Sequence, residues 1–426
     1  MPPPRVRNDW DVIPSPLAQN THNPIREIVE NLHLEPNSDK PMIALSIGDP
    51  TVFGNLGPPP EAVRAVADAL EAGRCHGYAP ATGHEAARAA VARYVLPPVA
   101  ARDVVLCSGC SGALDMALAA LAGPGRHVLV PCPGFPLYRT LLEGLGAVAR
   151  PYELRPERGW EADLEDLARK MDADCAALVV CNPSNPCGSV MSRAHLRALL
   201  RLAAARRVPI IADEVYERMS FARPFNSLAA LSRDVPVLAC GGLAKRFLAP
   251  GWRVGWVIMH DRGDVLERAG VRAALQRLAQ RTLGCTSLVQ AALPAILGAD
   301  HSKFFQDTLD TLQRHACAAH AALSVVPGLA PVMPQGAMYM MVGVSLERFP
   351  ALRSERHFVE RLVAEESVFL LPGQCFDYPS YVRLVLTAPE DMLLEACARI
   401  AAFCTRYYLL KSCDDTEEEA QARAEA

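Results

Sequence analysis

Short apolar runs alternate with helical stretches between about residue 100 and residue 260 of this chain. Six of these runs are apolar on both faces, namely residues 103–106, 127–130, 176–180, 209–212, 235–239 and 254–258. Strands that are apolar on both faces are typical of a mainly parallel sheet that helices cover on both sides. The pattern therefore predicts an α/β fold, with a large domain built on this sheet.

The segments on either side of the alternating region have different patterns. Val63, Val66, Ala67 and Leu70 recur at helical spacing, and Gly73 can end that helix in the left-handed conformation. The first sixty residues are rich in Pro, Asn and Asp, so we expect an arm with little helix or sheet of its own. We expect residues 1–60 to form the arm and part of a smaller α+β domain, and residues 61–315 to form the large domain. Residues 316–412 should form the small C-terminal domain, and residues 413–426 an acidic, disordered tail.

Composition excludes several classes of protein. The 426 residues are half hydrophobic and carry a net charge of −4, with Lys and Arg scattered, so no basic footprint for nucleic acid is present. No apolar segment is long enough to span a bilayer, and the Pro-rich start resembles neither a signal peptide nor a transit peptide. We therefore expect a cytoplasmic protein with no membrane or nucleic-acid partner.

The fourteen cysteines do not indicate a metal site. Most of them lie inside apolar runs, where a free cysteine behaves as a small hydrophobic residue, and we expect them to be reduced. Cys107 and Cys110 have the spacing of half a zinc site, but no second pair stands at the matching distance along the chain. The sequence therefore predicts no bound metal.

Polar and Gly-rich segments follow five of the six apolar runs. They are residues 109–111, 131–135, 182–188, 213–216 and 241–245. In open α/β sheets, ligands bind outside the carboxyl ends of the strands. We expect the five segments to converge on one crevice.

Two residues of these segments and one arginine that follows them indicate the ligand. Lys245 leaves a buried strand through Gly241 and Gly242, where its amine can be desolvated and made nucleophilic. Asp213 ends an apolar run, so its carboxylate needs a buried cationic partner, and a pyridinium nitrogen is one such partner. Arg253 presents donors that suit a phosphate, although a structural ion pair would also explain it. Together they fit pyridoxal phosphate.

Four further side chains have a functional interpretation beside an ordinary one. Ser111 can be the N-cap of a helix over residues 112–121, either as part of a phosphate site or as a plain cap. Phe135 can stack on a flat ring or pack locally, and Asn185, between two prolines, can aim its amide at a ligand or only mark a turn. Arg383 lies mid-strand, where it can grip a substrate carboxylate or face solvent on a half-exposed strand.

An ordered set of motifs resembles the fold-type-I pyridoxal-phosphate aminotransferases of class I. The motifs are residues 46–55, 77–80, 108–111, 133–139, 182–188, 212–216 and 241–246, and the similarity runs from about Asn23 to about Ala396. The resemblance implies a large domain and a small α+β domain, and a homodimer with shared active sites.

The resemblance also implies a role for each candidate. Lys245 would bind the cofactor covalently and shuttle a proton, and Asp213 would hold the pyridine nitrogen. The remaining cofactor contacts would be Tyr216 and Asn185 to the ring hydroxyl, Phe135 to the ring face, Gly109, Cys110, Ser111 and Arg253 to the phosphate, and Tyr78 to the phosphate of the partner subunit. The substrate α-carboxylate would be held by Arg383, Asn185 and the backbone of Gly48.

The implied reaction is ping-pong transfer of an amino group from an aromatic amino acid, tyrosine first, to a 2-oxo acid. The alternatives are an aminotransferase preferring alanine, methionine or kynurenine, and a non-catalytic regulator that binds the cofactor. The sequence departs from many aspartate aminotransferases at Gly242, where those enzymes have a phosphate-binding serine. It also shows no motif for a second arginine that could bind a dicarboxylate side chain.

Overall fold

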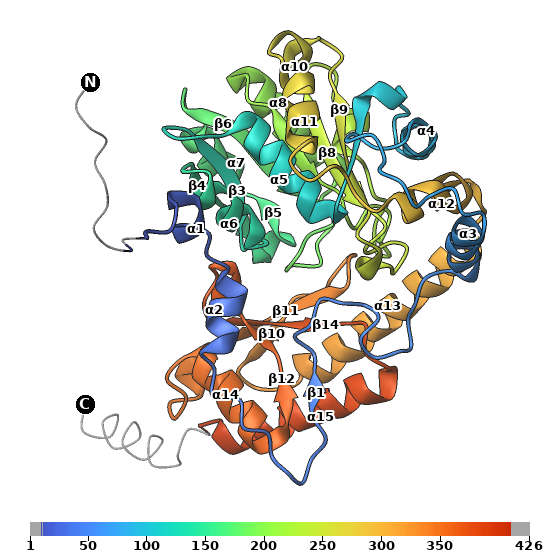
Figure 1. Ribbon diagram of the computed structural model, residues 1–426. Helices are drawn as coiled ribbons and strands as arrows, with labels where there is room; N and C mark the ends of the chain where they lie inside the picture. The colour runs from blue at the N-terminus through green and yellow to red at the C-terminus, as the bar shows by residue number, and fades with distance from the viewer. Residues whose placement is uncertain (1–9, 11, 410–426) are drawn as a thin grey trace, which may run out of the picture.

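The computed structural model of the chain describes Trp10 and residues 12–409. The acidic tail over residues 413–426 and the first nine residues lie outside the described residues. Figure 1 shows two parts, one around an eight-stranded sheet and one around a four-stranded antiparallel sheet. The division of the chain into domains stays a prediction, and its expected boundary after residue 315 lies inside the continuous helix α13 (Ser302–Ser324).

The eight-stranded sheet is mainly parallel, as the sequence predicts. Its strands, in spatial order, are β2 (Val104–Cys107), β9 (Gly255–His260), β8 (Val237–Gly242), β7 (Ile210–Asp213), β6 (Cys175–Cys181), β3 (His127–Cys132), β4 (Val148–Arg155) and β5 (Glu161–Ala162). The six apolar runs correspond to β2, β3, β6, β7, β8 and β9. β8, β7, β6, β3 and β4 are mutually parallel, so their carboxyl ends meet at one edge.

β9 runs antiparallel to both β8 and β2. The connection from β8 to β9 contains only a turn and the short 3₁₀ helix η3 (Pro250–Trp252). A parallel β9 would need a longer crossover connection, usually a helix, so the chain reverses direction instead. Since β2 is antiparallel to β9, it points in the same direction as β8. The exit of β2 therefore joins the other strand exits at the same edge.

Helices cover both faces of this sheet and bury it. Successive strand residues enter two different apolar clusters, as Val179 and Ile211 do on one face and Val180 and Ala212 on the other. The surrounding helices are α3 (Pro60–Glu71), α4 (Glu85–Tyr94), α5 (Gly109–Leu121), α6 (Leu137–Gly144), α7 (Leu164–Lys170), α8 (Arg193–Arg206), α9 (Leu228–Leu231), α10 (Val265–Arg268), α11 (Val271–Ala279) and α12 (Ser287–Gly298). The predicted helix over residues 63–70 is α3, and Gly73 follows it with φ +66°.

The second part combines the end of the chain with a piece of its beginning. Its antiparallel sheet has the order β10 (Leu329–Pro331), β11 (Tyr339–Val344), β14 (Tyr381–Val385) and β13 (Leu371–Pro372). It is covered by α13, α14 (Glu355–Glu366) and α15 (Glu390–Tyr407). The short strand β1 (Ile43–Ala44) pairs in parallel with β12 (Val368–Phe369), so a segment from the N-terminal arm pairs here with one from the last third of the chain.

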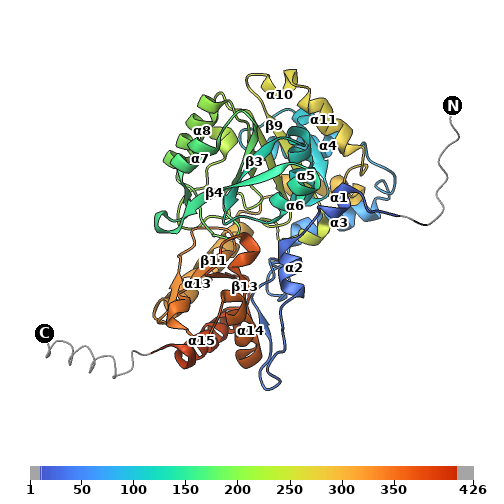
Figure 2. The same cartoon turned by 90° about the vertical axis from the view of Figure 1, so that its left-hand side faces the viewer.

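The N-terminal arm contains more helix than the sequence analysis expects. α1 (Pro16–Gln19) follows the N-cap Ser15, and α2 (Pro24–Glu30) follows the N-cap Asn23, each with a proline at the first helical position. Such a cap followed by Pro is a local start signal for a helix. In Figures 1 and 2, α2 lies at the junction between the two parts of the molecule.

Among the described residues, no helix combines the length and the apolarity that are needed to cross a membrane.

Candidate active site

A cavity of about 670 Å³ lies at the strand exits, and its walls come from both parts of the molecule. The expected site residues that line it are Gly48, Cys110, Ser111, Phe135, Asn185, Asp213, Tyr216, Lys245, Arg253 and Arg383. Gly109 lies directly beneath the Arg253 guanidinium, whereas Tyr78 is 92% exposed and outside this cavity. The structure thus brings the five strand exits together, with Arg383 added from the second sheet.

Lys245 lies just beyond the end of β8, half-buried in the cavity wall. Its Nζ donates a hydrogen bond to the carbonyl of Gly48, in the segment that follows β1. Nζ also lies 6.0 Å from the centroid of the Tyr216 ring. The amine is therefore held at the cavity surface by a neutral acceptor, and no carboxylate forms an ion pair with it among the described residues.

Asp213 ends β7 and is only 3% exposed. Tyr138 Oη donates to its Oδ2 at 2.6 Å, and Val215 N and Cys110 Sγ donate to its Oδ1 at 3.3 Å and 3.6 Å. Burial raises the pKa of this carboxyl, and the hydrogen bond from Tyr138 opposes that rise. All three hydrogen-bond donors to Asp213 in the described chain are neutral, so none of them is the buried cationic partner that the sequence analysis expects.

Tyr138 is a site residue that the sequence analysis missed. It lies in α6, is 1% exposed, and follows the turn that carries Phe135. The Phe135 ring meets the Tyr138 ring edge-on at a centroid distance of 5.9 Å, and Phe135 itself lines the cavity. The motif over residues 133–139 contained Tyr138, but a tyrosine inside an amphipathic helix gives no signal of its own.

Tyr216 and Tyr339 form a second pair at the cavity wall. Their hydroxyl oxygens lie 2.8 Å apart, and burial raises the pKa of Tyr216. Tyr339 comes from β11 in the second sheet, so this hydrogen bond joins the two parts of the molecule. Tyr339 was also missed, since its strand is apolar throughout and only the fold brings it to the site.

Arg383 is buried on β14, 3% exposed, so the interpretation as a surface arginine is wrong. Its Nη1 donates to Asn185 Oδ1 at 2.8 Å and its Nη2 donates to the carbonyl of Ser46 at 2.9 Å. The guanidinium carbon lies 4.3 Å from the centroid of the Tyr339 ring and 4.8 Å from that of Phe376. Burial lowers the pKa of Arg383, and its Nε is buried without a hydrogen-bond partner in the described chain. An anionic ligand would compensate this buried charge.

Arg253 and the start of α5 form a cradle for an anion. Gly109 has φ +68°, and a Cβ there would lie 2.6 Å from the Arg253 guanidinium. Arg253 Nη2 donates to the carbonyl of Ser108 at 3.2 Å, which fixes the guanidinium at the helix N-terminus. A helix N-terminus with free N–H groups and an adjacent arginine is a favourable anion site.

The expected role of Ser111 as N-cap is wrong. α5 begins at Gly109 rather than at residue 112, and its N-cap is Ser108. The left-handed conformation of Gly109 lets the helix start directly after β2, so Ser111 lies within the first turn. Ser111 remains exposed to the cavity, where its hydroxyl stands beside the free N–H groups.

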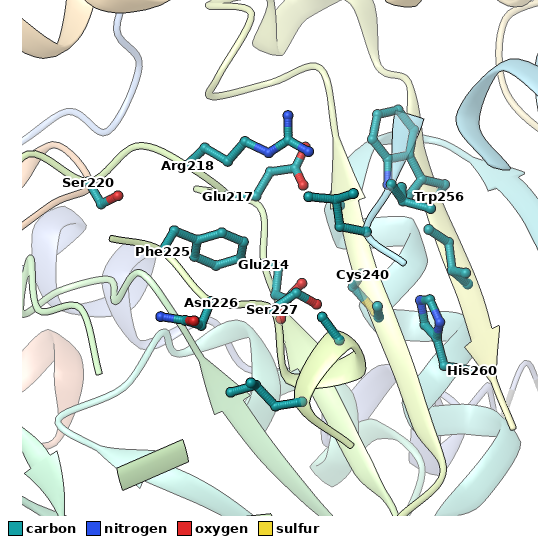
Figure 3. A pocket seen from close by; sticks show the side chains of 17 residues that line it. Glu214, Glu217, Arg218, Ser220, Phe225, Asn226, Ser227, Cys240, Trp256 and His260 are labelled. Carbon is teal, nitrogen blue, oxygen red and sulfur yellow. The ribbon is translucent and has the colours of Figure 1, made fainter. Parts of the chain in front are cut away.

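A second cavity, of about 410 Å³, is lined by Glu214, the residue that follows Asp213 in the chain (Figure 3). Cys240 on β8 and Trp256 and His260 on β9 form one wall, and Glu217 and Arg218 lie opposite them. Glu214 Oε1 accepts a hydrogen bond from Leu228 N at 2.8 Å. Burial raises the pKa of Glu214 to about 8 and lowers the pKa of His260 to about 4.

No group of three or more His, Cys, Asp and Glu side chains in the described part of the chain is arranged to hold a metal ion. The described cysteines are free thiols, and most are buried.

Comparison with known proteins decides the family. The family of class I and II aminotransferases matches residues 40–400. The chain belongs to this family. It is 51% identical to the tyrosine aminotransferase of Homo sapiens over 403 residues, which cover 94% of this chain and 88% of that relative.

Solved structures place the aminotransferase in the same fold class. The crystal structure of tyrosine aminotransferase from Leishmania infantum superimposes with a TM-score of 0.89 at 33% identity, covering 94% of this chain and 100% of that chain. Alanine aminotransferase from Pyrococcus furiosus superimposes with a TM-score of 0.86 at 27% identity, covering 92% and 100%. The expected α/β fold and the resemblance to fold-type-I aminotransferases are thereby confirmed, and the protein is an enzyme of this class.

Proposed function

We propose that this aminotransferase uses pyridoxal 5′-phosphate to transfer the amino group of an aromatic amino acid, tyrosine first, to a 2-oxo acid. One observation carries the proposal: the Lys245 amine, the Asp213 carboxylate and the Arg253 guanidinium line a single cavity, beside the N-terminus of α5. The tyrosine aminotransferases that resemble the chain support the choice of substrate.

The cavity fits the phosphate and the ring of this cofactor. The phosphate fits the cradle of Gly109, Cys110, Ser111 and Arg253, in which a Cβ at Gly109 would displace the guanidinium. Asp213 is a buried carboxyl that lines the cavity and has only neutral donors among its hydrogen-bond partners in the described chain, which suits the pyridine nitrogen. Phe135 is available for the ring face, and Tyr216 and Asn185 for the ring hydroxyl. When bound through Lys245, the cofactor supplies an electron sink for the substrate α-carbon.

Each protein group then has a defined task. Asp213 would hold the pyridine nitrogen in its protonated form, and the hydrogen bond from Tyr138 favours the ionised form of the Asp213 carboxyl. The Lys245 amine, once the substrate amine has displaced it from the cofactor, would take the proton from the substrate α-carbon and deliver it to C4′ of the cofactor. The Gly48 carbonyl, which accepts a hydrogen bond from Lys245 Nζ, orients that amine.

Arg383 and Asn185 would bind the substrate α-carboxylate. The two side chains are already hydrogen-bonded to each other at 2.8 Å, so the binding geometry is preformed. The unpartnered Nε and the aromatic rings around the guanidinium leave Arg383 as a buried cation that an α-carboxylate neutralises.

The remaining cavity wall suits an aromatic side chain. Ile25 and Val29 of α2, Phe369 of β12 and Leu371 of β13 line the same cavity. Apolar side chains on a rigid wall bind an aromatic ring by removing its surface from water.

The proposed working form is a homodimer with shared active sites. Tyr78 is 92% exposed, and Val63 and Leu70 of α3 are 48% and 52% exposed, so these three side chains are apolar or aromatic groups that a partner could cover. Tyr78 would then reach the cofactor phosphate of the partner subunit. A cytoplasmic location stays a prediction.

The proposal is tested with the purified protein loaded with pyridoxal phosphate. Each of tyrosine, phenylalanine, alanine, methionine, kynurenine and aspartate is added alone, and conversion of the cofactor to its amine form is followed by absorbance. We expect tyrosine to give the highest kcat/KM. Faster conversion by alanine, methionine or kynurenine would transfer the assignment to that substrate, and no conversion by any amino acid would refute amino transfer.

A further inference from the structure

Tyr339 contacts residues that the proposed function uses for three different tasks. It is the first residue of β11, is 1% exposed and lines the 670 Å³ cavity. Its hydroxyl oxygen lies 2.8 Å from that of Tyr216, and the centroid of its ring lies 4.3 Å from the guanidinium carbon of Arg383. A Cβ at Gly48 would lie 2.8 Å from Tyr339 Oη, so this hydroxyl also packs against the residue whose carbonyl accepts a hydrogen bond from Lys245. Tyr339 therefore stands next to the groups for the cofactor ring, the substrate carboxylate and the reactive amine.

The backbone of Tyr339 is fixed by both parts of the molecule. Ala337 N donates to the carbonyl of Met219 at 2.7 Å, and Met219 N donates to the carbonyl of Tyr216 at 2.9 Å. Gly188 lies against the carbonyl of Tyr339, since a Cβ at Gly188 would come within 2.3 Å of that oxygen. Main-chain hydrogen bonds thus tie together the segments that carry the two tyrosines, and the two hydroxyls meet in a preset geometry.

The strand register places the Tyr339 ring beside Arg383. Tyr339 pairs with Val385 and Met341 pairs with Arg383, so Tyr339 and Arg383 are diagonal neighbours on one face of the antiparallel pair. A guanidinium over an aromatic ring is attracted by the negative charge of the ring face. This contact favours the orientation in which Arg383 donates to Asn185 at 2.8 Å.

The number of hydrogens in the tyrosine pair gives the direction of its hydrogen bond. A phenol has one hydrogen to donate. In the proposed function, Tyr216 donates its hydrogen to the ring hydroxyl oxygen of the cofactor, so the Tyr216 oxygen is left to accept a hydrogen bond from Tyr339. Burial raises the pKa of Tyr216, which keeps this phenol protonated and able to donate.

We propose that Tyr339 is a positioning residue, whose hydroxyl orients the Tyr216 hydrogen towards the cofactor and whose ring holds Arg383 in place for the substrate carboxylate. The inference rests on the proposed function, because it requires Tyr216 to meet the cofactor ring and Arg383 to meet the carboxylate. A hydroxyl that accepts one hydrogen bond is a stronger donor in a second one, since the two bonds polarise each other. Loss of the Tyr339 hydroxyl should therefore weaken the hydrogen bond from Tyr216 to the cofactor.

The visible absorbance of the bound cofactor reports this hydrogen bond. A donor to the ring oxygen stabilises the anionic form of that oxygen, which then attracts the neighbouring proton on the nitrogen joined to Lys245 less strongly. The absorbance changes when this proton is lost, so the pH midpoint of the change should rise when the bond from Tyr216 is weakened. A tyrosine with only a structural role would leave the midpoint unchanged.

The first test is a pH titration of this absorbance in the holoenzyme of wild type, Tyr339→Phe, Tyr216→Phe and the double variant. Phenylalanine keeps the ring beside Arg383 and removes only the hydroxyl. We expect Tyr339→Phe to raise the midpoint by about half to one pH unit, the shift that one neutral hydrogen bond gives, and Tyr216→Phe to raise it at least as far. The double variant should titrate like Tyr216→Phe, because Tyr339 acts through Tyr216.

Tyr152→Phe is the matched control, because its buried hydroxyl bonds the carbonyl of Val179 and lines no part of this cavity. Its midpoint should equal that of wild type. A shift in Tyr216→Phe without one in Tyr339→Phe would overturn the role of the Tyr339 hydroxyl and leave the proposed function standing, and so would shifts that add in the double variant. Wild-type midpoints in both single variants would overturn this role and also the proposed contact of Tyr216 with the cofactor.

A binding measurement tests the role of the ring. Calorimetric titration of the holoenzyme with 3-phenylpropionate, which carries one carboxylate, requires no turnover. Tyr339→Phe should bind it within about twofold of wild type, whereas Tyr339→Leu, which lacks the ring, should bind it about three- to tenfold more weakly, as the loss of a cation–aromatic contact predicts. Equal affinity in the phenylalanine and leucine variants would show that the ring does not position Arg383.

Discussion

Tyr138 Oη lies 2.6 Å from Asp213 Oδ2, and this hydrogen bond joins α6 to the carboxyl end of β7 inside the protein. Both residues are buried, and the bond places a neutral donor behind the carboxylate, on the side away from the cavity. The strength of Asp213 as an anion therefore depends on a residue that no substrate contacts.

Tyr138→Phe removes this donor while keeping the ring. The pKa of Asp213 should rise further, because burial then acts against one fewer hydrogen bond. The acid limb of the pH profile of kcat/KM should move to higher pH, and cofactor affinity should fall about tenfold or more. Tyr152→Phe is the control, since its buried hydroxyl bonds only the carbonyl of Val179 at 3.0 Å. Identical pH profiles for the two variants would show that Tyr138 has only a structural role.

Lys245→Ala should abolish the visible absorbance of covalently bound cofactor and stop turnover. The fold should persist, because Lys245 makes only one hydrogen bond, to Gly48. The cofactor should still bind non-covalently through Asp213 and Arg253, which equilibrium dialysis would measure. Turnover at the wild-type rate would remove Lys245 from the mechanism.

Gly109→Ala tests the phosphate cradle. The new Cβ would lie 2.6 Å from Arg253 and would force an alanine to φ +68°, a conformation that costs about 1–2 kcal/mol. Displacement of the guanidinium should weaken cofactor binding about tenfold or more, as measured by fluorescence titration.

Gly112→Ala is the matched substitution three residues further along α5. Its Cβ would lie 3.5 Å from the Cys107 Cβ, an ordinary contact, and alanine favours a helix by about 0.5–1 kcal/mol over glycine. Equal losses of cofactor affinity in the two variants would contradict a specific role for the Gly109 and Arg253 contact.

Glu214→Gln should change how stability depends on pH. The folded pKa of Glu214 is raised from 4.5 to about 8, so between these values the folded state keeps a proton that the unfolded state releases. This group therefore lowers the free energy of unfolding by about 1.4 kcal/mol for each pH unit of rise through that window. Glutamine can still accept the hydrogen bond from Leu228 N without titrating.

The measurement is the thermal midpoint of wild type and Glu214→Gln from pH 5 to pH 8. The variant should gain stability relative to wild type as the pH rises. Parallel curves across this range would mean that the Glu214 carboxyl, drawn beside the second cavity in Figure 3, does not titrate as its burial requires.

Tyr78→Phe tests whether active sites are shared between subunits. The loss of one charge-assisted hydrogen bond should cost about 1.5–3 kcal/mol of cofactor affinity. In a mixed dimer of Tyr78→Phe and Lys245→Ala subunits, one composite site carries both defects and the other carries neither. Failure of the second site to regain wild-type cofactor affinity would place Tyr78 in its own subunit's site.

Six of the strands and their exits were predictable because they depend on local pattern. The apolar runs identified β2, β3, β6, β7, β8 and β9, and the shared direction of parallel strands brought Asp213 and Lys245 to one edge. The sequence allowed Arg383 either to bind a carboxylate inside the protein or to face solvent. Only its packing between Tyr339 and Phe376 decides that it is buried.

The missed residues depend on tertiary contacts. Tyr138 and Tyr339 occupy ordinary positions of a helix and a strand, and their hydroxyls matter only because Asp213 and Tyr216 lie opposite them. Ile25 and Val29 are similar, since α2 reaches the cavity only when the N-terminal arm docks against the second sheet. The error at Ser111 has a local cause, because the left-handed Gly109 moved the helix start by a few residues.

The two sheets contribute different kinds of side chain to the cavity. The large sheet supplies Lys245 and Asp213, whereas β11 and β14 supply Tyr339 and Arg383, and the hydroxyls of Tyr216 and Tyr339 meet at the border. Substitutions in the arm and in the last third of the chain can therefore change substrate preference while Lys245 and Asp213 stay in place. A catalyst divided in this way can be retuned for a new amino acid without rebuilding its chemistry.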